Sequence, residues 1–264
     1  MASRLSLRVV ALVYLGAVLV APVAVVAYKT FEPGLGSVWD SVTTPAAISA
    51  FWLTLEVAAI AVPLNAAVGV MTALALVRGK VPGRRFVEAL IDLPFAISPV
   101  VVGLALVLLY GREGWFGDDL AKAGVTILFS FPGLALATIF VTLPFVVREV
   151  APVLREVGED QEQAAATLGA SRWQAFWRIT LPAIRWGLVY GVVLSTARAI
   201  GEFGAVSVVS GKVAGETETL TLLVEKRFQN FDLSGAYAAS TLLALIALVT
   251  LGAMVLVNQR KELS

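Results

Sequence analysis

Two charged side chains interrupt an otherwise apolar stretch at residues 186–210. Arg198 and Glu202 are four residues apart, so on a helix they share one face and can neutralise each other. Ionisable groups inside a membrane segment cost roughly 2.5–3.5 kcal/mol each on insertion scales, and they usually face a bundle interior or an aqueous path. The pattern therefore indicates either a transport path or gate formed by Arg198, Glu202 and the adjacent Phe203, or a structural ion pair between packed helices.

A second candidate for a transport path is Ser98, which lies between two prolines. Pro94 and Pro99 are five residues apart, and each interrupts the hydrogen-bond ladder of a helix and frees backbone carbonyls. Irregular backbone at membrane depth usually lines a cavity or is buried in protein. Ser98 is therefore a candidate for a translocation path, and a simple packing kink is the equal alternative.

The sequence lacks the residues that most enzymes need. It contains no histidine and no cysteine, which removes the commonest general base, the commonest metal ligand and all thiolate chemistry. It has no G-x-x-x-x-G-K-[S/T] phosphate loop, so we expect no ATP hydrolysis by this chain. The formal net charge is +1, which gives no general field for nucleic acid. We predict a non-enzyme that binds no metal, cofactor or nucleic acid itself.

The longest polar stretch, at residues 158–185, reads GEDQEQAAATLGASRWQAFWRITLPAIR. Asp160 and Gln163 have the spacing of a capping box, and the alanine-rich run that follows favours a helix. Glu162 lies in the first turn, where its charge suits the helix dipole. Gly169 predicts the end of this helix in a left-handed conformation.

A second short helix is predicted after Gly169. Ser171 and Gln174 repeat the capping pattern, and we expect Pro182 to end or kink the helix. An apolar face at helical spacing is formed by Trp173, Phe176 and Trp177. The stretch 158–185 thus reads as helix, tight glycine turn, helix.

This stretch resembles the signature of binding-protein-dependent ABC importer permeases, E-A-A-x3-G-x9-I-x-L-P. The matching positions are Gln163, Ala164, Ala165, Gly169, Ile179, Leu181 and Pro182. Gln163 stands where the family most often has Glu, and the neighbouring Glu162 lies on a different side of the helix. The resemblance implies that the loop is a coupling helix, which docks into a cleft on an ATPase subunit. The residues that it assigns to this contact are Glu162, Gln163, Ala164, Ala165, Gly169, Ala170 and Ser171.

The composition is that of a membrane protein. The chain has 264 residues, of which 58% are hydrophobic, and its mean hydropathy is +0.85. A spanning chain must satisfy its backbone hydrogen bonds internally, so each apolar window is expected to be a helix. We predict an all-α membrane protein, a single permease domain over residues 1–264. Its six transmembrane helices are expected at residues 9–28, 57–77, 93–111, 123–147, 186–210 and 233–257.

The distribution of basic residues predicts the orientation. Most of the 20 Lys and Arg residues lie near the two termini and in loops 78–92 and 148–185. The side richer in these residues faces the cytoplasm, so we expect both termini and loop 148–185 to be cytoplasmic. Loop 78–92 is expected to be rich in turns. Its charges either contact a partner or anionic lipid, or simply follow the positive-inside rule.

Between the last two predicted spans, the outer loop 211–232 is expected to contain a short helix. Leu220, Leu223, Val224 and Phe228 would share one face of this helix. Such a helix would lie on the membrane surface, cap a pathway or contact a binding protein.

Further stretches narrow the resemblance to one subfamily. The most specific is Gly201-Glu202-Phe203-Gly204-Ala205-Val206, and Asp92-Leu93-Pro94-Phe95 and Gly114-Trp115-Phe116-Gly117 add to it. They resemble the W-type permease subunits of sulfate/thiosulfate ABC importers. The resemblance implies a multi-pass protein of the inner (plasma) membrane that pairs with a T-type permease. It also implies an ATPase dimer that binds ATP and Mg, and an extracytoplasmic sulfate-binding protein.

Three alternatives remain open. In a related permease the substrate would be molybdate, tungstate or another tetrahedral oxyanion. No residue in the sequence distinguishes these anions from sulfate by their size. A stand-alone secondary transporter or channel would need no ATPase, and a membrane-embedded scaffold would carry no flux. Copurification with an ATPase separates the first alternative from the other two.

Overall fold

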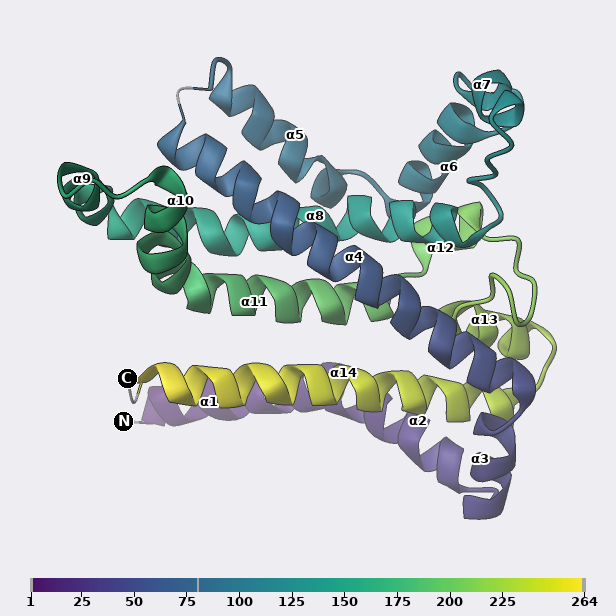
Figure 1. Ribbon diagram of the computed structural model, residues 1–264. Helices are drawn as coiled ribbons and strands as arrows, with labels where there is room; N and C mark the ends of the chain where they lie inside the picture. Colours follow the sequence, from purple (N-terminus) through teal and green to yellow (C-terminus); the bar gives the residue numbers. More distant parts are fainter. Residues whose placement is uncertain (1, 80, 263–264) are drawn as a thin grey trace.

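The computed structural model describes residues 2–79 and 81–262, and every regular element in these two ranges is a helix (Figure 1). Five helical segments are long and apolar enough to cross a membrane. They are Arg8–Phe31, which includes most of α1 (Ala2–Leu15), η1 (Gly16–Val20) and α2 (Ala21–Phe31), then α4 (Pro45–Arg78), α8 (Phe131–Val157), Arg172–Ile200 and Leu233–Thr250 of α14 (Leu233–Glu262). Membrane-spanning helices thus dominate the fold, as the composition predicts.

The third expected span is broken. Helix α5 (Arg84–Ala96) and helix α6 (Pro99–Tyr110) meet at an angle of 110° and count as a sixth span only if the pair is taken together. Ile97 and Ser98 are extended because Pro99 disfavours the helical conformation in the residue before it, and Pro99 then begins α6. Pro99 therefore lies at a sharp break rather than a gentle kink, whereas Pro94 is accommodated inside α5.

Several other span boundaries also differ from the prediction, among them the start of the fourth span and the end of the fifth. The fourth helix begins at Phe131 instead of Ala123, because Gly124 and Phe129 have positive φ angles of 68° and 58°. The fifth ends at Ile200, and residues 204–209 form a separate short helix, α12 (Gly204–Val209). Hydropathy does not detect the break before Phe131, since residues 123–130 carry no charge.

The basic loop 78–92 is also more ordered than predicted. Gly83 adopts a left-handed conformation with φ 70°, and α5 begins directly after it at Arg84. Residues 84–92, most of this loop, are therefore helical.

The centre of the molecule is formed by α4, α8 and α11 (Leu181–Ile200), which pack along their lengths (Figure 1). Glycines allow the close approach: a Cβ atom on Gly191 would lie 2.9 Å from the Cα atom of Val146. Asn65 of α4 is fully buried and its amide donates to Ile139 O at 3.0 Å and to Thr142 Oγ1 at 2.7 Å on α8. These contacts fix α4 against α8 in the central bundle of α4, α8 and α11.

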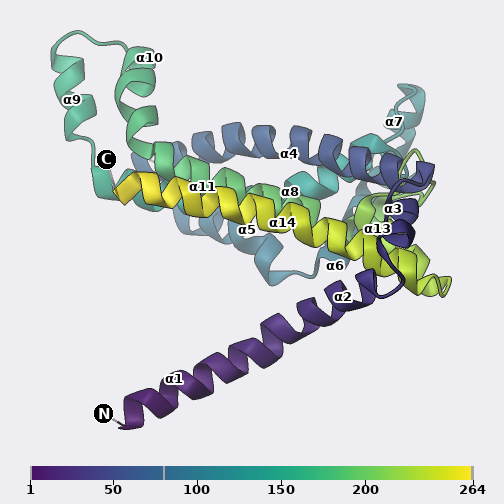
Figure 2. The same ribbon diagram turned by 90° about the horizontal axis from the view of Figure 1, so that it is seen from below.

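The first helical segment, Arg8–Phe31, extends away from the central bundle. In Figure 2 α1 diverges from the other helices, and none of its most apolar window is buried. The C-terminal end of this segment contacts α14, where Thr30 Oγ1 lies 2.7 Å from Thr241 Oγ1. Helix α3 (Leu35–Val42) follows at that end, which leaves the apolar surface of α1 open to lipid or to another protein.

In both views, the start of α1 and the last part of α14 lie at the end of the molecule that also carries α9 (Asp160–Thr167) and α10 (Arg172–Ala175) (Figures 1 and 2). Helices α7 (Gly117–Lys122) and α13 (Leu220–Gln229) lie at the opposite end. The polar loop 158–185 and α13 are thus separated by the full length of the bundle.

Candidate functional site

Loop 158–185 forms two short helices joined by a tight turn. Gly169 has a φ angle of 84°, and Ala170 N donates to Ala165 O at 3.0 Å across the turn. No atom lies within 4 Å of a Cβ atom placed on Gly169, so the backbone conformation, not crowding, requires glycine here. The predicted left-handed helix end is therefore confirmed.

One of the two predicted capping boxes forms. Gln174 N donates to Ser171 Oγ at 3.2 Å, and Ser171 N donates to Gln174 Oε1 at 2.8 Å. The box predicted at Asp160 is wrong: α9 starts one residue earlier, with Glu159 as its N-cap and no side-chain cap bond. Asp160 instead lies inside the first turn, where its charge still favours the helix dipole.

Pro182 does not end the second helix. A π-helical turn, η2 (Phe176–Thr180), continues α10, and Leu181 N donates to Phe176 O, five residues back. Pro182 then occupies the first turn of α11, and residues 172–200 form one helical segment. The wider π turn accommodates the proline, which lacks the N–H that an α-helical ladder would need.

Glu162 faces the body of the protein. Its Oε2 atom lies 3.3 Å from Nε of Arg78, the last residue of α4, and its Oε1 atom accepts a hydrogen bond of 2.8 Å from Thr180 Oγ1. Arg78 also donates to the carbonyl of Gly158. One carboxylate thus joins the end of α4, the start of α9 and η2.

The other residues assigned to coupling lie on the outer side of this loop. Gln163, Ala164, Gly169 and Ser171 are exposed, and Ala165 and Ala170 are half-buried. Leu168 beside them is 89% exposed and Trp173 is 69% exposed. The loop therefore presents a smooth surface of small residues edged by large apolar side chains, which is the kind of surface that enters a groove on a partner protein.

Trp173, Phe176 and Trp177 pack on one another beside this surface. The ring centroids of Trp173 and Trp177 are 5.4 Å apart with an edge-to-face arrangement, and those of Phe176 and Trp177 are 5.3 Å apart. The predicted apolar face of the second helix is confirmed, and it stiffens the loop at the π turn.

In the charged pair at the end of α11, the Glu202 carboxylate is buried and the Arg198 side chain is partly exposed. The Glu202 side chain is 1% exposed, and its Oε2 atom lies 2.5 Å from Arg198 NH1. Its Oε1 atom accepts a hydrogen bond of 2.9 Å from Ala205 N in the first turn of α12, while Thr221 Oγ1 donates to its backbone carbonyl at 2.9 Å. Glu202 therefore ties α11, α12 and α13 together, and the predicted Arg198–Glu202 ion pair forms.

Ser98 and Phe203 lie beside a contact between the broken third span and α12. A Cβ atom on Gly204 would be 2.8 Å from Pro99 Cβ, so these two segments touch. Ser98 immediately precedes Pro99, Phe203 immediately precedes Gly204, and both side chains are exposed. Ser98 and Phe203 thus lie at the contact between α6 and α12, and Arg198 and Glu202 lie at the end of α11 that leads into α12.

Several residues at these sites were not singled out from the sequence. Arg78, Thr180 and Thr221 hold Glu162 and Glu202 in place across long sequence separations. The only available sign was the polar character of Arg78 at the end of an apolar window. Among the described residues no cluster of three or more Asp or Glu side chains could hold a metal ion.

A family model described as the binding-protein-dependent transport system inner membrane component matches residues 65–263. The chain belongs to this permease family. It is 51% identical over 250 residues to the sulfate transport system permease protein CysW of Synechocystis sp., which covers 95% of this chain and 91% of that protein. It is 48% identical to CysW of Escherichia coli K12, over 89% of this chain and 80% of that protein. Both relatives are named as permease proteins of sulfate transport systems.

A further relative supports this family assignment, and a solved structure shows the same fold. The chain is 38% identical to the sulfate transport system permease protein CysT of Escherichia coli K12, over 91% of this chain and 87% of that protein. A bacterial ABC transporter that imports alginate has the same fold, with a TM-score of 0.78, 19% identity and coverage of 97% of this chain and 94% of that one. The all-helical permease fold is therefore shared with ABC importers of different substrates.

Proposed function

We propose that this chain is a transmembrane permease subunit of an ATP-driven, binding-protein-dependent importer of sulfate or thiosulfate. The observation that carries the proposal is the identity of about half of all residues, over nearly the whole chain, to W-type sulfate permeases from several organisms. The lower identity of 38% to a T-type permease favours the W-type role. The chain would therefore pair with a T-type permease in the inner membrane.

The proposed coupling element is the helix–turn–helix of residues 158–185. Its exposed residues Gln163, Ala164, Gly169 and Ser171 would enter a cleft on an ATPase subunit, which binds and hydrolyses ATP with Mg. Glu162 would act differently, because its carboxylate is held by Arg78 and Thr180. It would orient α9 so that the motion of the ATPase reaches α4 and α11 directly.

The proposed transport cycle begins with delivery of the anion to the outer face by a soluble binding protein. ATP binding closes the ATPase dimer and brings the two coupling loops together. The broken third span, α8 and α11 then rock, and access alternates between the two sides. Such a path needs only a weak site, because strong binding would slow release.

The proposed path runs past the junction of α6, α11 and α12. Ser98 and Phe203 are exposed there, and Arg198 is partly exposed and would supply a positive charge to a passing anion. Glu202 would set the position of this junction rather than contact the anion, since both of its oxygens are engaged. In this arrangement both termini and loop 158–185 lie in the cytoplasm and α13 lies outside.

The test is reconstitution of this subunit with a T-type permease, the ATPase and the binding protein in liposomes. ATP-dependent uptake of labelled sulfate that is blocked by thiosulfate, and barely by molybdate, is the expected result. ATP-driven uptake of molybdate instead would retain the fold and mechanism and overturn the substrate. Flux without ATP would overturn the importer role altogether.

A further inference from the structure

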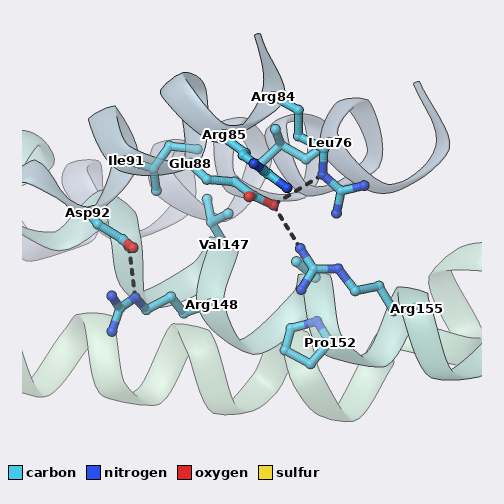
Figure 3. Close-up of a pocket in the computed structure, with 11 residues that line it drawn as sticks. Leu76, Arg84, Arg85, Glu88, Ile91, Asp92, Val147, Arg148, Pro152 and Arg155 are labelled. Atoms are coloured by element: carbon cyan, nitrogen blue, oxygen red, sulfur yellow. Dashed lines mark hydrogen bonds and ion pairs between the residues drawn. The ribbon is translucent and has the colours of Figure 1, made fainter. Parts of the chain in front are cut away.

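Four arginines line one pocket at the end of the bundle that carries loop 158–185. The pocket has a volume of about 490 Å³ and lies between α5 and α8, with Leu76 near the end of α4 as part of its wall. Figure 3 shows side chains of both helices directed toward each other across it. The charged lining residues are Arg84, Arg85, Glu88 and Asp92 of α5 and Arg148 and Arg155 of α8. Four guanidinium groups thus face two carboxylates, and the pocket carries an excess of positive charge.

The two carboxylates hold three of the arginines. Glu88 Oε1 accepts from Arg84 Nε at 3.1 Å and from Arg155 NH2 at 2.9 Å, so one oxygen serves two guanidinium groups (Figure 3). Asp92 Oδ1 accepts from Arg148 Nε at 2.9 Å. Arg85 has no carboxylate within ion-pair distance among the described residues. The pocket therefore lacks negative charge to match its arginines.

The start of α5 also lacks negative charge. Arg84 and Arg85 are its first two residues, its first turn contains no acidic residue, and its N-cap Gly83 provides no side-chain bond. A helix N-terminus carries a partial positive charge and favours anions, so two arginines there have the wrong sign. A bound anion would neutralise both the helix terminus and the arginines. It would thereby explain why two basic residues occupy the first turn, where acidic residues are normally preferred.

The ion pairs in the pocket can yield to such an anion. The paired side chains are about one-third to one-half exposed, and ion pairs this exposed contribute little stability. The guanidinium of Arg148 lies 4.5 Å from the ring centroid of Phe95, which holds it in place independently of Asp92. Arginine forks match the geometry of sulfate and phosphate oxygens, so the same side chains are suited to both.

We propose that the α5–α8 arginine pocket binds a negatively charged tetrahedral oxyanion group. The ligand is either a free anion, such as sulfate that has crossed the membrane, or the phosphate group of a lipid. Phe86 and Leu90 of α5 are exposed next to the pocket, which suits lipid chains. Leu76 and Arg155 lie within a few residues of Arg78 and Gly158, which suits a cytoplasmic anion near the coupling loop.

The test uses the complete complex in detergent and compares Arg85→Gln with wild type. Arg85 is exposed and loses no ion pair, so this variant is expected to fold. Arg112→Gln is the matched control, because Arg112 is also exposed and unpaired among the described residues but follows α6 at the opposite end of the bundle. Thermal unfolding is measured against sodium sulfate and against sodium chloride at equal ionic strength. The general stabilising action of sulfate is common to all three proteins.

For a free anion, half of the sulfate-specific rise in Tm should require at least roughly tenfold more sulfate in Arg85→Gln than in the control, because a charge-assisted hydrogen bond is lost. For a lipid source, native mass spectrometry should show a phosphate-bearing lipid on wild type and control and not on Arg85→Gln. If Arg85→Gln and Arg112→Gln agree in both measurements, the pocket binds no oxyanion and its arginines reflect only the positive-inside rule.

The choice of sulfate as probe rests on the proposed function, but the charge argument does not. The binding test needs neither ATP nor flux. Failure of the pocket would therefore leave ATP-driven uptake in liposomes unaffected, and failure of uptake would leave the difference between Arg85→Gln and Arg112→Gln intact.

Discussion

Arg78 and Glu162 form an ion pair, with 3.3 Å between Nε and Oε2, that joins the last residue of α4 to the first turn of α9. The two side chains are 15% and 24% exposed, so solvent screens the pair less than a surface bridge. Thr180, the last residue of η2 directly before α11, donates a further hydrogen bond to Glu162. The proposed coupling loop is thereby attached to two of the three central helices.

Replacing Glu162 with Gln should lower uptake per ATP hydrolysed while the complex still assembles. The change removes a charge-assisted contact of about 1.5–3 kcal/mol, so α9 would no longer be fixed relative to α4. The measurement is the ratio of transport to ATP hydrolysis in liposomes. Lys29→Ala, which breaks the exposed pair with Glu32, serves as control and should leave the ratio unchanged.

Arg78→Ala should produce the same uncoupling, and the double variant Arg78→Ala/Glu162→Gln should be little worse than either single variant. Residues that act through one shared contact are not additive. Additive losses in this double-mutant cycle would show that the two side chains act separately.

Replacing Gly169 with Val should abolish ATP-driven uptake without preventing membrane insertion. A β-branched residue at φ 84° costs about 1–2 kcal/mol or more and would open the turn between α9 and α10. Gly215→Val is the matched control, since Gly215 has φ 87° and open surroundings in the loop between α12 and α13. Retained transport in Gly169→Val would contradict the assignment of this loop to coupling.

Arg198→Ala should destabilise the protein, because it leaves the buried Glu202 carboxylate unpaired, at a cost of about 3–5 kcal/mol. Arg198→Ala/Glu202→Gln should recover much of that stability, as measured by thermal unfolding. If Arg198 also attracts the anion, uptake will remain low in the double variant. Normal uptake in that stable double variant would make the pair purely structural.

Gly191→Leu should destabilise the core, since even its Cβ atom would lie 2.9 Å from the Cα atom of Val146 on the facing helix. Gly16→Leu, with no atom within 4 Å of its added Cβ, should insert and unfold like wild type. Thermal unfolding of the two variants measures this difference. Equal stability of both would mean that α8 and α11 are not closely packed.

The sequence alone determined the class of the protein and the local form of its key loop. Apolar windows predicted helices because a backbone in lipid must bond internally, and Gly169 with the Ser171–Gln174 box predicted the turn because both signals are local. The spaced residues from Gln163 to Pro182 indicated the permease family for the same reason: a short motif preserves its spacing along the chain.

Only the tertiary structure decided which side chains meet. The expected start of the fourth span was wrong because left-handed Gly124 and Phe129 break an apolar run that hydropathy reads as continuous. Glu162 carries the same charge whether it faces an ATPase or Arg78, and no spacing rule relates residues 84 positions apart. The arginine pocket likewise exists only because the break at Ile97 and Ser98 and the packing of α5 on α8 bring two distant basic segments together. Local rules act over a few residues, whereas these contacts depend on how the helices pack.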